Sequence, residues 1–141
     1  MSKASSRVEW SSGRRSPEYT GDQTAFDVAL AFGRTDAEIL VGIETKYHEW
    51  AEPEDVPHPT ERLPRYRDIA ETSGIFKPDW ERRILGKPTQ QIWRDELLLL
   101  SLLQHDSSRW VGGHYVLVHP KGTRASGMQQ RSTRRHSFAD G

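Results

Sequence analysis

The chain has 141 residues, of which 34% are hydrophobic and 28% are charged, and it contains no cysteine. This length accommodates one domain, and the absence of cysteine excludes a disulfide scaffold, a thiolate zinc site and a cysteine nucleophile. The formal net charge of zero excludes a bulk polycation. No apolar run approaches the length of a membrane span, and the N-terminus lacks the apolar segment of a signal peptide, so we expect a cytoplasmic protein.

The charge is distributed unevenly along the chain. Residues 1–20 carry four basic and two acidic side chains, residues 121–141 carry five and one, and the intervening hundred carry 11 and 17. Both ends are rich in Ser, Gly and Arg, and such segments bury too little apolar surface to fold. We therefore predict a mostly flexible N-terminal segment with a possible short strand at 7–10, a folded domain over 21–120, and a basic disordered tail over 121–141. The tail is either simply solvated or attracted to a polyanion.

Two apolar segments open the predicted domain. Residues 24–32 (TAFDVALAF) and 38–46 (EILVGIETK) flank a short polar turn, which predicts an antiparallel hairpin. Both segments are apolar on both faces, as in a sheet that is covered on two sides.

The remainder of the chain predicts helices and a last strand. Prolines interrupt residues 47–88, where a short helix is expected at 63–72. Leucines at helical spacing predict a second helix over 89–105, with Thr89 as its N-cap. Residues 110–120 (WVGGHYVLVHP) predict a final strand. This order of elements indicates an α/β (α+β) fold.

Charged side chains at the predicted hairpin are the strongest indication of function. Asp27 interrupts the first strand, and Glu44 and Lys46 end the second, where the period of two places both on one face. If the hairpin pairs as expected, two carboxylates and one ammonium share a patch of an apolar sheet. A divalent cation relieves the repulsion between carboxylates, and a lysine beside it can orient a water. The competing explanation is a cross-strand salt bridge at the end of a sheet.

This pattern resembles the PD-(D/E)XK nuclease superfamily. The superfamily carries an acid on one strand and (D/E)xK on the next, followed by a helix and a further strand. The segments VEW, GRRS, TAFD, GIETKYHE and QQIWRDELLL resemble an uncharacterised bacterial branch of it. The resemblance implies a restriction-endonuclease-like fold, with a mixed central sheet flanked by helices and possibly without its first helix.

The resemblance also implies roles for particular residues. Asp27 and Glu44 match the metal-binding acids, and the backbone carbonyl of Thr45 would be a further ligand for Mg²⁺ or Mn²⁺. Lys46 matches the lysine that positions the attacking water. Glu49 is a possible additional acid, although a solvated loop carboxylate is the simpler interpretation.

The predicted 89–105 helix carries a second element of the resemblance. Gln90, Gln91 and Arg94 match a glutamine with a basic or aromatic partner that related exonuclease-like branches carry there. Gln90 and Arg94 are four residues apart, so they share a helical face and could reach the lysine, the metal-bound water or a phosphate. The competing explanation is ordinary surface polarity near the start of a helix. The superfamily often has another acid before its first strand, for which Glu9 is a weak candidate.

Three functions are compatible with these observations. The leading one is a metal-dependent nuclease with a nucleic-acid partner, expected to be DNA because the superfamily mostly acts on DNA, and possibly a homodimer. The second is a catalytically defective or truncated member that binds nucleic acid or a protein. The third is a small interaction module whose buried charges only set strand register. No membrane partner is expected.

Overall fold

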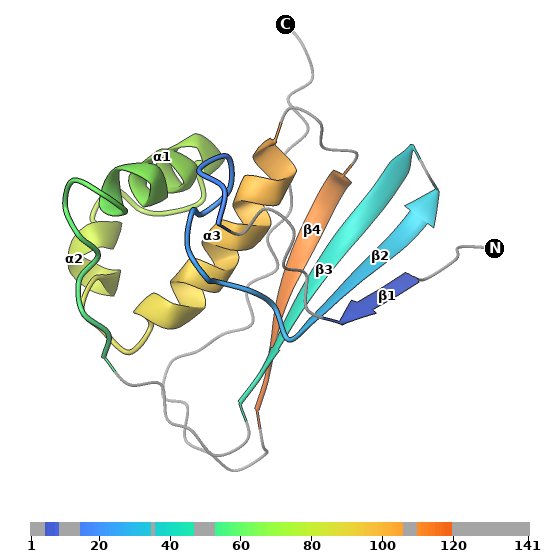
Figure 1. Ribbon diagram of the computed structural model, residues 1–141, viewed down its shortest axis with the longest axis horizontal. Helices are drawn as coiled ribbons and strands as arrows, with labels where there is room; N and C mark the ends of the chain where they lie inside the picture. Colours follow the sequence, from blue (N-terminus) through green and yellow to red (C-terminus); the bar gives the residue numbers. More distant parts are fainter. Residues whose placement is uncertain (1–4, 9–14, 35, 47–52, 106–109, 120–141) are drawn as a thin grey trace, which may run out of the picture.

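The computed structural model describes residues 5–8, 15–34, 36–46, 53–105 and 110–119 (Figure 1). Four strands and three helices lie within these ranges. In chain order they are β1 (Ser5–Val8), β2 (Val28–Arg34), β3 (Ala37–Thr45), α1 (Leu63–Ser73), α2 (Trp80–Ile84), α3 (Gln90–Gln104) and β4 (Trp110–Val118).

The four strands form one mixed sheet in the order β1-β2-β3-β4. β1 pairs with β2, and β2 with β3, in antiparallel orientation. The β2–β3 hairpin runs from Val28 opposite Ile43 to Arg34 opposite Ala37, which confirms the predicted hairpin. β4 then lies parallel to β3 on its other side, after the helices have carried the chain back to the start of the sheet. The predicted mixed sheet with helices is therefore confirmed.

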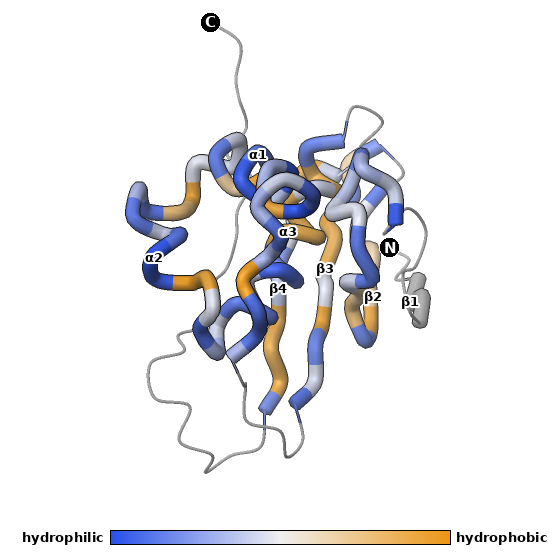
Figure 2. Tube along the Cα trace, turned by 60° about the vertical axis from the view of Figure 1, so that its left-hand side comes forward, coloured by the Kyte–Doolittle hydropathy of each residue, from blue (hydrophilic) through white to orange (hydrophobic). Residues whose placement is uncertain are grey.

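Helix α3 is the centre of the packing. Its leucines bury one side of the helix against β2, β3 and β4, and the other side against α1 and α2, so the helices form two layers over the sheet (Figure 1). Apolar segments run along β2, β3 and β4 and along α3 (Figure 2). This double contact explains why Leu97, Leu98 and Leu99 are all 2% exposed or less, since a helix packed on two sides needs apolar residues around most of its circumference.

The helices cover one face of the sheet (Figure 1). Ala29 and Ala31 on β2 are buried beneath them, whereas Phe32 and Ile39 are 37% and 38% exposed. Burial alternates along β2 and β3, as expected of strands with one covered face. The prediction of a sheet covered on two sides is therefore wrong for the described residues, because apolar character on both faces of a strand does not require helices on both faces.

Several predicted boundaries differ from those observed. β2 begins at Val28, so residues 24–27 lead into the strand and are not part of it. β1 overlaps the predicted 7–10 strand only at Arg7 and Val8, and α2 was not predicted. Thr89 does precede α3, but its side chain makes no capping hydrogen bond.

Other predictions concern the ends of the chain and the membrane. No helix precedes β2 among the described residues, and the possible lack of a first helix stays a prediction. Residues 121–141 lie outside the described ranges, and the three-part division of the chain stays a prediction. None of the helices in the described part of the chain has the length and apolarity needed to cross a membrane.

Candidate functional site

The start of β2 and the end of β3 bring the predicted acids together. The antiparallel register pairs Val28 with Ile43, so Asp27 comes opposite Glu44 where the ladder ends. One carboxylate oxygen of Asp27, Oδ2, accepts a hydrogen bond of 2.8 Å from the Thr45 backbone N–H and another of 2.7 Å from the Thr45 hydroxyl. Thr45 therefore orients Asp27 through two donors, which leaves Oδ1 of the same carboxylate for another partner.

Glu44 and Lys46 form an ion pair on one face of β3. Glu44 Oε1 and Lys46 Nζ are 3.3 Å apart, and both side chains are largely shielded from solvent, at 12% and 14% exposed. Burial raises the pKa of Glu44, the negative charge of Asp27 raises it further, and Lys46 partly opposes both effects. The negative charge of the exposed Asp27 thus acts on the buried carboxylate of Glu44, and an additional positive charge beside them would be stabilising.

The donor set at this position suits a hard divalent cation. Mg²⁺ typically binds one or two carboxylates and completes its shell with water, and Asp27 and Glu44 supply that number. Among the described residues no three acidic or histidine side chains converge into a preformed metal cluster. Glu9 and Glu49, the other acids considered from the sequence, lie outside the described residues. The backbone carbonyl of Thr45 as a ligand stays a prediction.

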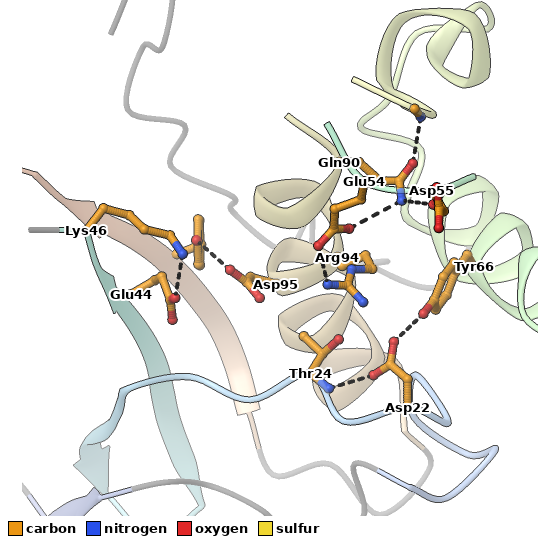
Figure 3. Close-up of polar contacts among 12 residues, drawn as sticks. Asp22, Thr24, Glu44, Lys46, Glu54, Asp55, Tyr66, Gln90, Arg94 and Asp95 are labelled. Carbon is orange, nitrogen blue, oxygen red and sulfur yellow. Dashed lines mark hydrogen bonds and ion pairs between the residues drawn. The ribbon is translucent and has the colours of Figure 1, made fainter. Parts of the chain in front are cut away.

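A polar cavity of about 530 Å³ lies beside Glu44, between the sheet and α3. Two of the residues predicted on α3, Gln91 and Arg94, line it. Glu44 and Asp95 contribute carboxylates to the same walls (Figure 3). The remaining lining residues come from the segment before β2 and from the residue before α1; they are Gln23, Thr24, Ala25 and Arg62.

Gln90 does not join this cavity. It is only 2% exposed, and its amide oxygen accepts a 2.7 Å hydrogen bond from the Gly86 backbone N–H. Its amide nitrogen donates to the Asp55 carbonyl at 2.8 Å and to Glu54 at 3.3 Å. The prediction that Gln90 reaches the lysine or a phosphate is therefore wrong, because its hydrogen bonds join α3 to the segments on either side of α1 and α2.

Arg94 is held by the same segment. Its Nη2 lies 2.7 Å from Glu54 Oε1, with about a quarter of each side chain exposed (Figure 3). Glu54 partly neutralises the guanidinium and restrains its position. Arg94 therefore presents a positive charge to the cavity in a fixed orientation.

Asp95 is a site residue that the sequence analysis missed. Burial raises its pKa to about 8, and the charge of Glu44 adds to the rise, while Tyr115, Arg94 and Lys46 oppose it. The Tyr115 hydroxyl donates a 3.0 Å hydrogen bond to Asp95 Oδ2. Asp95 is thus a second carboxyl group in the cavity, within electrostatic range of Glu44. The available signal was its position four residues after Gln91, which places the two residues on one side of the helix.

The segment that leads to Asp27 is anchored by a buried aspartate. Asp22 Oδ1 accepts hydrogen bonds from the Thr20 hydroxyl at 2.9 Å and the Thr24 N–H at 2.8 Å. The Tyr66 hydroxyl on α1 donates to the other oxygen of Asp22 (Figure 3). Burial would raise the pKa of Asp22, but these hydrogen bonds outweigh burial and lower it. This anchor ties the approach to β2 to helix α1.

The fold and the site together define a class of protein. An antiparallel β2–β3 pair extended by a parallel β4, with an acid at the start of β2 and Glu-Thr-Lys at the end of β3, has the restriction-endonuclease-like arrangement. A family model described as the PD-(D/E)XK nuclease superfamily matches residues 2–136, and the chain belongs to this superfamily. No curated protein and no solved structure matches the chain.

Proposed function

We propose that this chain is a metal-dependent nuclease that hydrolyses phosphodiester bonds, with DNA as the expected substrate and Mg²⁺ or Mn²⁺ as the metal. The observation that carries the proposal is the shielded 3.3 Å pair of Glu44 and Lys46, with the Asp27 carboxylate hydrogen-bonded to the residue between them. Superfamily membership supports the nuclease class.

Asp27 and Glu44 are the residues that would hold the metal. A bound Mg²⁺ or Mn²⁺ supplies positive charge beside a phosphate and lowers the pKa of water. The raised pKa of Glu44, caused by burial and by Asp27, supports this assignment because a cation offsets the same two unfavourable effects. The two donors of Thr45 restrict how Asp27 can turn.

Lys46 would orient the attacking water. Its ammonium has three N–H donors. One of them points to Glu44, a proposed metal ligand, so the ammonium lies beside the proposed metal site. Arg94 and Gln91 line the adjoining cavity, where their guanidinium and amide groups would donate hydrogen bonds to phosphate oxygens. Such donors stabilise the charge that develops on the phosphate in the transition state.

The test uses the purified full chain with plasmid and single-stranded DNA, in Mg²⁺, Mn²⁺ or EDTA. We expect cleavage that EDTA abolishes and that Lys46→Met reduces by about 10²-fold or more. Calorimetry should show that Lys46→Met still binds Mg²⁺, whereas Asp27→Asn does not. Equal cleavage by wild type and Lys46→Met would overturn the proposal. Metal binding without cleavage of any nucleic acid would favour the defective, binding-only member.

A further inference from the structure

The cavity extends beyond the residues that the proposed hydrolysis requires. This open, polar cavity of about 530 Å³ has room for more than a metal and one phosphate. Carboxylates line it through Glu44 and Asp95, whereas Arg62 and Arg94 line it with guanidinium groups. Arg62 immediately precedes α1. Neither the PD-(D/E)XK motif nor the proposed reaction assigns a role to this part of the chain.

Arg62 differs from the other arginines of the helical layer. Arg65 pairs with Asp68, Arg67 with Glu81, and Arg83 with Asp79. The positive charges of these three arginines are thus partly neutralised by neighbouring carboxylates. Among the described residues the guanidinium of Arg62 has no hydrogen-bond or ion-pair partner, although it lines the cavity. Its five donors are therefore available to a ligand.

The charges of Arg62 and Arg94 act on a common neighbour. The pKa of Tyr66 is raised to about 12, chiefly by burial and by its hydrogen bond to Asp22, and both guanidiniums oppose this rise. Both positive charges are thus within electrostatic range of one phenol at the α1 side of the site. They come from different elements, since Arg94 lies on α3 and Arg62 precedes α1.

The lining favours a phosphate over a base. The remaining lining side chains of the cavity are amides, a hydroxyl and a methyl group, from Gln23, Gln91, Thr24 and Ala25. No aromatic side chain is among the described lining residues, so a base has no surface to stack on there. Guanidinium groups bind phosphate oxygens in bidentate fashion, and amides and hydroxyls add single hydrogen bonds.

We propose that Arg62 binds a second phosphate group of the nucleic-acid strand in this cavity, next to the phosphate that Arg94 contacts. The inference rests on the proposed function for its substrate class, but strand binding can be measured without cleavage. The second phosphate is either an internal phosphodiester or a terminal phosphomonoester. These sources share the chemistry that Arg62 recognises and differ in charge and in position along the strand.

The test measures binding of short fluorescent single-stranded oligonucleotides by anisotropy, in the Lys46→Met background with Mg²⁺, so that the strand stays intact. Loss of one charge-assisted contact should weaken binding about tenfold for Arg62→Ala. The slope of log K against log salt should fall by about 0.7. Arg62→Lys should recover part of the affinity, since it restores the charge without the bidentate geometry.

Arg34→Ala is the matched control. Arg34 is also exposed, but it ends β2, roughly 20 Å along the strand from Asp27, and we expect its removal to leave binding unchanged. Because Arg62 is exposed and has no described side-chain partner, the Arg62→Ala variant should unfold at the wild-type temperature. With cleavage-competent protein, Arg62→Ala should raise KM and leave kcat nearly unchanged.

Strands with different ends identify the source of the phosphate. A loss of affinity confined to oligonucleotides with a terminal phosphate supports the phosphomonoester, and an equal loss for hydroxyl-ended and circular strands supports the internal phosphodiester. If Arg62→Ala binds every strand as tightly as its parent, or weakens no more than Arg34→Ala does, the subsite is wrong. Weaker binding by Arg62→Ala in a protein that cleaves nothing would retain the subsite and overturn only the nuclease activity.

Discussion

The carboxylate of Asp27 is hydrogen-bonded twice to Thr45, at 2.8 Å from the backbone N–H and 2.7 Å from the side-chain hydroxyl. The middle residue of the Glu-Thr-Lys triplet thus connects the acid before β2 to the end of β3. Such a contact acts on the candidate metal site indirectly, by orienting a ligand.

Thr45→Val should therefore impair metal binding more than folding. It removes the hydroxyl donor to Asp27 and retains the backbone donor, the shape and the β propensity. We expect Mg²⁺ affinity to fall about tenfold by calorimetry and the free energy of unfolding in urea to fall by about 1 kcal/mol. Thr45→Ser keeps the hydroxyl and should bind Mg²⁺ like wild type. Unchanged affinity in Thr45→Val would mean that the backbone N–H alone orients Asp27.

Asp95 should make the stability of the metal-free protein depend on pH. Because burial and Glu44 raise its folded pKa from 3.8 to about 8, the folded state binds a proton that the unfolded state has lost. The contribution of this group is fully present below about pH 4 and is lost as pH rises to about 8. Asp95→Asn removes this dependence and keeps an acceptor for Tyr115. In EDTA, urea unfolding should show Asp95→Asn gaining a few kcal/mol over wild type between about pH 4 and pH 8.

The exposed Asp36 on the β2–β3 hairpin provides the control for this measurement. Asp36→Asn removes the same charge outside the cavity and therefore controls for the general effect of losing one negative charge. A pH-independent difference for Asp95→Asn would show that Asp95 is ionised in the folded protein despite its burial. In that case Glu44, Arg94 and Lys46 would act on Asp95 from positions other than those described above.

Glu54 should restrain the affinity of the cavity for phosphate. Its carboxylate lies 2.7 Å from Arg94 and neutralises part of the charge that a nucleic-acid strand would meet. We expect Glu54→Gln to tighten binding of single-stranded DNA about threefold, while stability falls by about 1 kcal/mol or less because the pair is partly solvated. Glu71→Gln, which removes an exposed charge from α1 outside the cavity, should leave binding unchanged. Weaker binding in Glu54→Gln would instead show that Glu54 positions Arg94 for the strand.

Gly42 should tolerate no side chain because Phe26 packs against it. A Cβ at Gly42 would lie 2.6 Å from Cε1 of Phe26. The Phe26 side chain is only 1% exposed, so the surrounding core restricts its movement away from the new methyl group. We expect Gly42→Ala to reduce the free energy of unfolding by about 1–3 kcal/mol and to lower cleavage as well, since Phe26 immediately precedes Asp27. At Gly112 a Cβ meets nothing within 4 Å, so Gly112→Ala should be nearly neutral in both assays. Equal stability of the two variants would mean that Phe26 can repack.

Local patterns were sufficient for most of the fold. The polar turn between two apolar segments correctly predicted the β2–β3 hairpin, and leucine spacing correctly predicted α3. α2 was missed because its five residues are too few for a helical period to appear. The prediction that both faces of the sheet are covered was wrong for the described residues, since strands that are apolar on both sides do not indicate whether helices pack against one face or both.

The candidate site was likewise predicted only in part from local patterns. Glu44 and Lys46 were expected on one face of β3 because side chains alternate along a strand, and their 3.3 Å ion pair agrees with that geometry. On α3 the spacing did not distinguish Gln90 from Gln91, which are adjacent in sequence. Only the rotation of α3 against the sheet decides that Gln91 lines the cavity while Gln90 is buried beneath residues 54 and 55.

The sequence by itself thus indicated the superfamily through a resemblance of its motifs. It also determined the hairpin and the acids and lysine along it, because strand alternation and short turns are local properties of the chain. The tertiary structure alone decided that Arg62 and Asp95 share a cavity with Glu44, and that Glu54 pairs with Arg94. These residues are separated by up to about fifty positions in sequence, and their proximity depends on how α1 and α3 pack over the sheet. Packing of that kind is set by the whole apolar core, which no local pattern around the charged residues encodes.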